Sequence, residues 1–93
     1  MRYRVEFIPA ALRDMYRLDP NVATRIRSRL QWLADNLDQL QQRKLKGDFA
    51  GLSKFRVGDY RVAYTFDPRG RVLLVHMVGH RRDIYDIFWD DLP

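Results

Sequence analysis

The sequence predicts an α+β protein in which an N-terminal helical hairpin packs against a mixed, mainly antiparallel sheet of four strands. Three observations predict this class. A short alternation of polar and apolar residues comes first, two amphipathic helical segments follow it, and three strand-like segments separated by tight turns come last. Strands and helices segregated in this way are typical of α+β folds. The predicted order is β-α-α-β-β-β, with a short C-terminal helical turn.

Length and composition indicate a single domain over residues 1–93. Domains most often contain about 100–150 residues, and 93 residues of which 46% are hydrophobic suffice for one modest core. The sequence contains no cysteine, which excludes a disulfide framework and thiolate metal ligands. No apolar stretch approaches the roughly 20 residues that cross a bilayer. We therefore expect a cytoplasmic protein that does not enter a membrane.

The first strand and the helix after it follow from residue spacing. Residues 2–8 alternate in polarity and place Tyr3, Val5 and Phe7 on one face, as a short strand does. Pro9 then suits the first turn of a short helix, because the N–H that proline lacks has no partner there.

The second helix has a clear start signal. Asp19 is expected to cap it and Pro20 to occupy its first position. Apolar residues then recur every three or four positions, which predicts an amphipathic helix over about 20–37. These residues are Val22, Ile26, Leu30, Leu33 and Leu37. The helices form an antiparallel hairpin, and residues 38–51 are expected to be loop.

A β-hairpin is predicted around the dipeptide Gly58-Asp59. Residues 52–57 and 60–66 are strand-like, and glycine in the first central position favours a type II′ turn. Asp67 to Gly70 forms a second turn. Residues 72–78 are almost continuously apolar, as a strand covered on both faces should be. A last helical turn is expected to use Ile84, Ile87 and Phe88.

The hairpin register assigns residues to the two faces of the sheet. Val57 should face Tyr60, and directly opposed residues project from the same side. The predicted core face carries Phe55, Val57, Tyr60, Val62, Tyr64 and Phe66. The opposite face carries Lys54, Arg56 and Arg61, which we call the basic basin, beside the small residues Ala63 and Thr65. Three cations over a small-residue floor suit a phosphate chain, although a solvated charged face is the alternative.

The charge distribution also points to a polyanionic partner. The net charge is +5, and 14 of the 17 basic residues are arginine, whose planar guanidinium suits phosphate. Residues 43–82 contain ten basic and three acidic residues, whereas residues 83–93 contain four aspartates and no basic residue. Nucleic acid or an acidic protein would match such a basic middle, and ordinary solubility charge is the alternative.

A second group of reactive side chains follows the last strand and comprises His80, Arg81, Arg82 and Tyr85. Internal cleavage of RNA needs a base for the 2′-hydroxyl, cations around the transition state and an acid for the 5′-oxygen. Arginine supplies fixed charge, and histidine carries protons near neutral pH. Tyrosine serves as base where cations lower its pKa. In the structural alternative, Tyr85 is a core aromatic and His80 caps the strand.

Other chemistries have less support. His76 lies inside the apolar strand and is expected to be packed and hydrogen bonded. His76 and His80 lack the neighbouring carboxylates that a zinc site would need. The sequence contains no phosphate-binding glycine loop, nucleophile elbow or dinucleotide fingerprint. We therefore expect a metal-independent reaction without a cofactor.

Three segments together resemble the RelE/ParE toxin superfamily: Leu45-Lys46-Gly47, the hairpin from Gly51 to Tyr64, and Gly79-His80-Arg81-Arg82-Asp83-Ile84-Tyr85. The strand that leads into Pro9 is similar to the family's opening, so the resemblance covers nearly the whole chain. It implies a toxin of a type II toxin–antitoxin pair. RelE-like members cut mRNA in the ribosomal A site without a metal.

The resemblance also implies roles for individual residues. Lys54 and Arg56 would bind the substrate backbone, and Arg61 would contact the phosphate. Arg81 would stabilise the transition state, and Tyr85 would be the base.

Further roles and one departure follow from the same resemblance. His80 is an alternative proton carrier, and Lys46 and Arg82 are further RNA-binding candidates. Leu52 and Ser53 stand where RelE-like enzymes often have another basic residue, which leaves the proton donor open.

The partners implied by the resemblance are an antitoxin, the ribosome and mRNA, with a hetero-oligomer of toxin and antitoxin. Two alternatives remain open. One is a ParE-like inhibitor of DNA gyrase without catalysis of its own, and the other is an inactive binder that keeps only the antitoxin interface. The ParE-like branch generally lacks the complete set of basic residues and tyrosine, so we expect cleavage.

Overall fold

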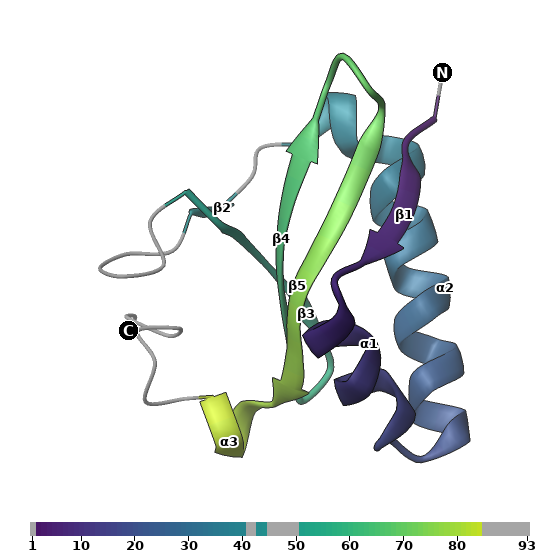
Figure 1. The fold of residues 1–93 in the computed structure, drawn as a ribbon, viewed down its shortest axis with the longest axis vertical. Coiled ribbons are helices and arrows are strands. Elements are labelled where there is room, and N and C mark those ends of the chain that lie inside the picture. Colours follow the sequence, from purple (N-terminus) through teal and green to yellow (C-terminus); the bar gives the residue numbers. More distant parts are fainter. Residues whose placement is uncertain (1, 41–42, 45–50, 85–93) are drawn as a thin grey trace.

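The computed structural model describes residues 2–40, 43–44 and 51–84, and it confirms the predicted α+β class. In chain order the elements are β1 (Arg4–Phe7), α1 (Pro9–Tyr16), α2 (Pro20–Asn36), the 3₁₀ turn η1 (Leu37–Gln39), β2 (Arg43–Lys44), β3 (Ser53–Val57), β4 (Tyr60–Asp67), β5 (Val72–His80) and α3 (Arg81–Ile84). Both long helices lie on the same side of the sheet (Figure 1). No helix in these ranges is long and apolar enough to span a membrane.

The sheet is mixed, with strand order β1-β5-β4-β3-β2. Strand β1 runs parallel to β5, with Arg4 paired to Val72, whereas the other neighbours are antiparallel. The helical hairpin carries the chain from β1 across one face of the sheet, and such a crossover is what a parallel pair requires. Strand β5 therefore lies between the first strand and the β3–β4 hairpin.

The two long helices begin where the sequence predicts. Helix α1 begins at Pro9, and the side chain of Asp19 caps α2 by accepting a hydrogen bond from the backbone N–H of Asn21 at 2.9 Å. Helix α2 ends at Asn36, one residue before the predicted end, and continues into the 3₁₀ turn. The predicted stripe on α2 is buried at four of its five positions; Val22 is half-buried.

The core lies between this stripe and one face of the sheet. The predicted core face of the hairpin is confirmed: Val57, Val62 and Tyr64 are buried, and Phe55, Tyr60 and Phe66 pack against them half-buried. Tyr3, from the chain just before β1, is 3% exposed and joins the same core. Removing these aliphatic and aromatic groups from water is the main driving force for the fold.

The predicted hairpin register is confirmed at every pair. Val57 pairs with Tyr60, and Arg56 pairs with Arg61. Gly58 has φ of +57°, and Asp59 is not among the residues with positive φ. This combination is the one that a type II′ turn requires.

Two local expectations need correction. Residues 38–51 were expected to be loop, but η1 covers part of them and β2 pairs with β3 through Arg43 and Lys44. A two-residue strand is too short to show alternation in sequence. The β4–β5 turn is also one residue longer than expected, because the carbonyl of Asp67 accepts from the N–H of Arg71, which has φ of +56°.

A polar cluster closes the end of the molecule where this turn lies. The Arg71 guanidinium donates to both carboxylate oxygens of Asp38, at 2.9 and 3.4 Å, and lies 4.1 Å from the ring centroid of Tyr3. The Tyr3 hydroxyl donates to Asp38 at 3.2 Å. Hydrogen bonding from Arg71 lowers the pKa of Asp38, so its carboxylate stays ionised. The cluster joins three segments through Tyr3, Asp38 and Arg71: the chain before β1, the 3₁₀ turn η1 and the β4–β5 turn.

Candidate functional site

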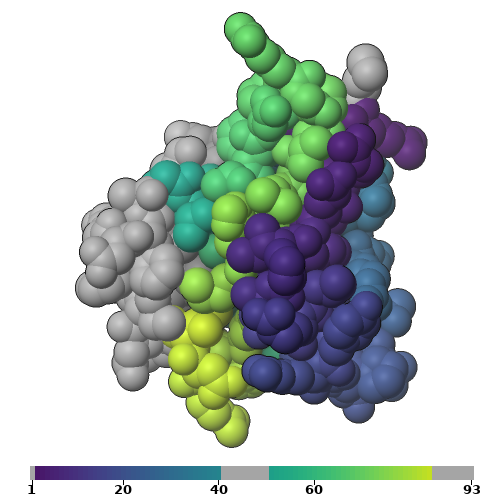
Figure 2. Space-filling view, viewed as in Figure 1, coloured from purple at the N-terminus to yellow at the C-terminus, as the bar shows by residue number. Residues whose placement is uncertain are grey.

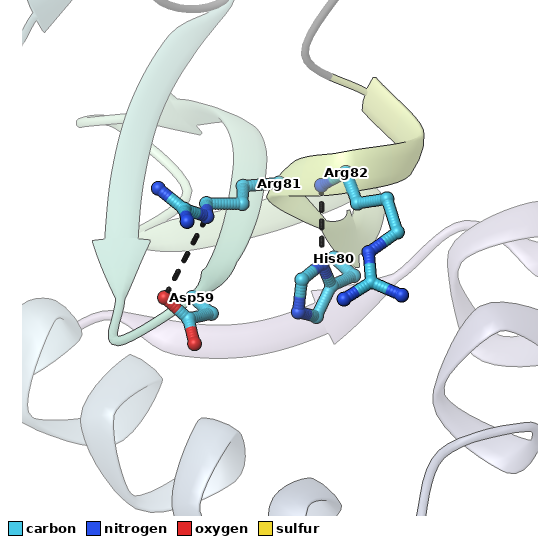
Figure 3. A pocket seen from close by; sticks show the side chains of 4 residues that line it. All are labelled: Asp59, His80, Arg81 and Arg82. Atoms are coloured by element: carbon cyan, nitrogen blue, oxygen red, sulfur yellow. Dashed lines mark hydrogen bonds and ion pairs between the residues drawn. The ribbon is translucent and has the colours of Figure 1, made fainter.

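A pocket lies at the opposite end of the sheet, where β5 ends and α3 begins. It has a volume of about 460 Å³ and is lined by Asp59, His80, Arg81 and Arg82. Three of these residues are consecutive in the chain, and Asp59 comes from the β3–β4 turn (Figure 3). The structure therefore brings the predicted post-strand cluster and the predicted hairpin turn together in one place.

Arg81 is an exposed cation of this pocket. Its side chain is 61% exposed, and its Nε lies 3.8 Å from Oδ1 of Asp59. Its backbone N–H donates to the carbonyl of Asp59 at 2.7 Å. The first residue of α3 is thus attached to the turn by its main chain and by its side chain.

Packing on the sheet fixes the direction of α3. Ile84 is 7% exposed and packs on Ala63, with Met77 and Leu52 beside them. A Cβ built on Gly79 would lie 3.2 Å from Cγ2 of Ile84, so the missing side chain leaves room for this close approach. The chain can therefore bend back over the sheet directly after β5.

His80 is held on two sides. Its Nδ1 accepts a hydrogen bond from the backbone N–H of Arg82 at 3.0 Å. Its ring meets Tyr60 edge to face, with centroids 5.2 Å apart. Because Nδ1 accepts, the neutral imidazole carries its proton on Nε2, and this atom can donate a hydrogen bond to a ligand. The contact with Arg82 agrees with the strand-cap alternative, and the proton-carrier role stays a prediction.

The predicted basic basin is not an open surface. Arg56 is exposed and Lys54 is half-buried, but Arg61 is only 4% exposed. Nη1 of Arg61 donates to the carbonyls of Gly58 and Tyr60, at 3.0 and 3.2 Å. The expectation of three cations on a wet face is therefore wrong at Arg61, whose charge lies beneath the turn.

The floor of the basin also differs from the expectation. Ala63 has no exposed surface, because Ile84 covers it. Thr65 is half-buried and its hydroxyl is hydrogen bonded to Nε2 of His76 at 2.9 Å. The prediction that His76 is packed and hydrogen bonded is confirmed, and burial lowers its pKa. The small residues of this face support α3 and a half-buried histidine instead of forming a phosphate channel.

A second hollow adjoins the pocket across His80. It has a volume of about 480 Å³ and lies between the end of α1 and α3, where it is lined by Asp14, Arg17, Leu18 and Ile84 among others. Figure 2 shows these segments at the same end of the molecule. Asp14 accepts a hydrogen bond from the N–H of Val78 at 3.3 Å, which caps the edge of β5 beyond its pairing with β1.

Some predicted site residues lie outside the described ranges, namely Tyr85 and Lys46, as do Ile87 and Phe88 of the predicted last helical turn. One residue was missed by the sequence reasoning. Asp59 was assigned only to the turn, although it is the one acidic residue within the basic hairpin from Gly51 to Tyr64. That isolated negative charge was the available signal.

The described pocket can bind an anion and donate hydrogen bonds to it. Arg81 and Arg82 supply exposed positive charge to the pocket that His80 also lines. Such a set can hold a phosphate and stabilise charge that develops on it. Within residues 2–40, 43–44 and 51–84, no three histidine, aspartate or glutamate side chains lie together as a metal site would require.

Comparison with known proteins places this geometry among toxins. A family model described as the ParE toxin of the type II toxin–antitoxin system parDE matches residues 5–85. Toxin RelG of Mycobacterium tuberculosis is 30% identical over 88 residues, which cover 91% of this chain and 98% of RelG.

Solved structures give the same result for the fold. The toxin–antitoxin complex RelBE2 of M. tuberculosis contains a chain with a TM-score of 0.77 and 26% identity, covering 87% of this chain and 93% of that one. A mutant of Escherichia coli toxin RelE in the free state has a TM-score of 0.72 over 95% of both chains. At 22% identity, the second likeness supports the fold alone.

Proposed function

This chain belongs to the ParE toxin family of type II toxin–antitoxin systems, within the RelE/ParE superfamily, and from that premise we propose that it is a metal-independent endoribonuclease. Its substrate is mRNA in the ribosomal A site, and cleavage arrests translation. The observation that carries the proposal is the pocket that Arg81, Arg82 and His80 line together, with both arginines exposed.

The roles in the proposal combine the geometry of the pocket with those that the family resemblance implies. Arg81 binds the scissile phosphate and stabilises the charge of the transition state, since a fixed cation at that place lowers the barrier most effectively. His80 donates a hydrogen bond from Nε2 to a phosphate oxygen, because Nδ1 already accepts from the backbone N–H of Arg82. In this assignment the base is Tyr85, as the resemblance implies.

The remaining cations guide and support the RNA. Arg56 and Arg82 are exposed and bind the flanking phosphates in the proposal. Lys54 and Lys46 are further RNA-binding residues, as the resemblance implies. Arg61 acts from below: it holds the β3–β4 turn and adds positive potential to the site, since a buried charge is screened little by salt.

An antitoxin is the proposed protein partner. The solved relatives include complexes of RelE with RelB from E. coli, Pyrococcus horikoshii and Methanococcus jannaschii. An acidic segment that folds on binding would neutralise the exposed arginines and block the pocket. We expect such a toxin–antitoxin hetero-oligomer to be inactive in cleavage.

The test is a cell-free translation reaction with purified protein, in which new 5′ ends on the message are mapped with and without ribosomes. We expect cuts within translated codons only when ribosomes are present. The Arg81→Ala variant should leave the message intact while remaining folded, because this side chain is exposed. The Tyr85→Phe variant tests the phenol, and unchanged cleavage would move the base role to another residue.

A matched control is available at the other end of the sheet. Arg69 is exposed in the β4–β5 turn, so Arg69→Ala removes the same charge far from the pocket and should cleave normally. An intact message with the wild-type protein would remove the cleavage proposal. Inhibition of DNA supercoiling by gyrase would then be the next activity to measure.

A further inference from the structure

We propose that Asp59 is a positioning residue that orients the Arg81 guanidinium before RNA arrives. This inference rests on the cleavage function proposed above. Asp59 does not contact the reacting atoms in the proposal; it acts through Arg81.

Two contacts from one residue support this role. The main-chain bond from Arg81 to the carbonyl of Asp59 measures 2.7 Å, and the side-chain ion pair measures 3.8 Å. In Figure 3 the carboxylate of Asp59 faces the Nε side of the Arg81 guanidinium. A carboxylate on the Nε side leaves the two terminal nitrogens of arginine available for a phosphate, which they bind as a fork.

The turn that carries Asp59 is itself held in place. Gly58 takes the positive φ that the turn needs, and Arg61 donates to the carbonyls on both sides of Asp59. The β3–β4 register continues to Val57 and Tyr60, the residues next to the turn. The backbone of Asp59 is therefore fixed, so its carboxylate can hold the long side chain of Arg81 in one orientation.

Electrostatics argue against a role of Asp59 in binding RNA directly. A carboxylate in the pocket repels phosphate, so its presence weakens RNA binding by itself. An exposed ion pair also adds little to the stability of a fold, and both side chains here are more than 60% exposed. Orientation of Arg81 is the role that fits both facts, because a displacement of about 1 Å in a catalytic group can cost on the order of 100-fold in rate.

The kinetic test measures kcat and KM for cleavage of mRNA bound to ribosomes, and it compares Asp59→Asn with a charge-matched control. Asparagine suits turns and removes only the charge. We expect kcat to fall by on the order of 10- to 100-fold, with KM unchanged or lower because a repulsive charge has gone. Asp83→Asn removes the same charge from the exposed face of α3 and should leave kcat unchanged. Asp59→Glu keeps the carboxylate and should retain a higher kcat than Asp59→Asn does.

A double substitution distinguishes an effect of Asp59 on the orientation of Arg81 from a general loss of structure in the Asp59 variant. In an Arg81→Lys background no Nε exists for Asp59 to hold, so adding Asp59→Asn should change kcat little. A full additional loss of kcat in that background would overturn the proposal. So would a higher KM with normal kcat in the single variant.

A spectroscopic measurement makes the inference independent of cleavage. The ¹⁵Nε–H resonance of Arg81, assigned by its disappearance in Arg81→Lys, should change its chemical shift in Asp59→Asn but not in Asp83→Asn, because only the first variant removes the carboxylate 3.8 Å from Nε. An unchanged resonance in Asp59→Asn would refute the positioning role even if RNA is cut. If the wild-type protein cuts no RNA, the proposed function falls, and the resonance still decides whether Asp59 holds Arg81.

Discussion

Replacing Arg61 by methionine tests whether this buried arginine supports the hairpin turn. The substitution keeps an unbranched apolar stem in the space of a residue that is 4% exposed, but it removes the donor that serves the carbonyls of Gly58 and Tyr60. The facing residue offers a matched control. Arg56 pairs directly with Arg61 and is exposed, so Arg56→Met makes the same chemical change at the exposed member of the same pair.

The expected cost follows from the two hydrogen bonds. Both come from Nη1, at 3.0 and 3.2 Å, and this charged nitrogen carries two N–H bonds, one for each carbonyl. Removing the guanidinium also removes the cost of burying a charge, which offsets about one of the two hydrogen bonds. Such a bond contributes about 1.5–3 kcal/mol. The turn carbonyls can recover part of it from water, which leaves a loss of about 2 kcal/mol. For a domain of this size, that lowers Tm by roughly 8–16 °C.

The assay is urea and thermal unfolding followed by circular dichroism, for Arg61→Met, Arg56→Met and the wild-type protein. We expect Arg56→Met to unfold within about 0.5 kcal/mol of wild type, as exposed substitutions usually do. If Arg61→Met is as stable as Arg56→Met, the reasoning fails. The loss of cleavage in an Arg61 variant would then point to direct contact with RNA and not to support of the turn.

Three further predictions concern RNA binding, alkaline pH and a helix cap. Raising salt from about 50 to 200 mM should weaken binding of a short single-stranded RNA by about 20-fold, because three phosphate contacts give a slope near −2 for the logarithm of the binding constant against that of the salt concentration. The three contacting cations are Arg56, Arg81 and Arg82. Equal affinity at both salt concentrations would exclude phosphate contacts by these arginines. Burial raises the pKa of Tyr64 to about 12 from the ordinary 10.0, so the unfolded chain loses this proton at lower pH than the folded protein does. The free energy of unfolding that the protonated Tyr64 contributes is therefore complete below pH 10 and is lost as the pH rises towards 12. Urea unfolding at pH 8 and 11 should show a loss of about 1 kcal/mol that is absent in Tyr64→Phe, and equal pH dependence in both proteins would contradict this. Asp19→Ala should destabilise the protein by about 1 kcal/mol through loss of the α2 cap, whereas Asp19→Asn should keep the wild-type Tm in thermal unfolding because asparagine caps as well as aspartate. An unchanged Tm in the alanine variant would show that the cap contributes nothing.

The sequence predicted those parts of the fold that depend on local chemistry. Asp19 and Pro20 defined the start of α2, because capping needs only neighbouring backbone groups. The Gly58-Asp59 turn defined the β3–β4 register and, through alternation along the strands, the side of the sheet on which each residue projects. These inferences use distances of a few residues, and the structure confirms them.

The parts that failed depend on segments that are distant along the chain. Alternation placed Arg61 and Ala63 on the face away from the helices, but it contains no information about what covers that face. Ile84 of α3 covers Ala63 there. In the same way, the contact between Asp59 and Arg81 arises only once β4 and β5 are paired, so spacing in the sequence does not reveal it.

The parallel pairing of β1 with β5 has a consequence for synthesis of the protein. Arg4, at the start of the chain, has its partner at Val72, so β1 and the helical hairpin leave the ribosome well before the strand that they cover exists. The apolar stripe of α2 stays exposed during that interval, and contacts between distant segments form slowly. His80 and Arg81 follow directly on β5, so the pocket forms only after the central strand is made. In our proposal, a nascent toxin is therefore harmless to the ribosome that is making it.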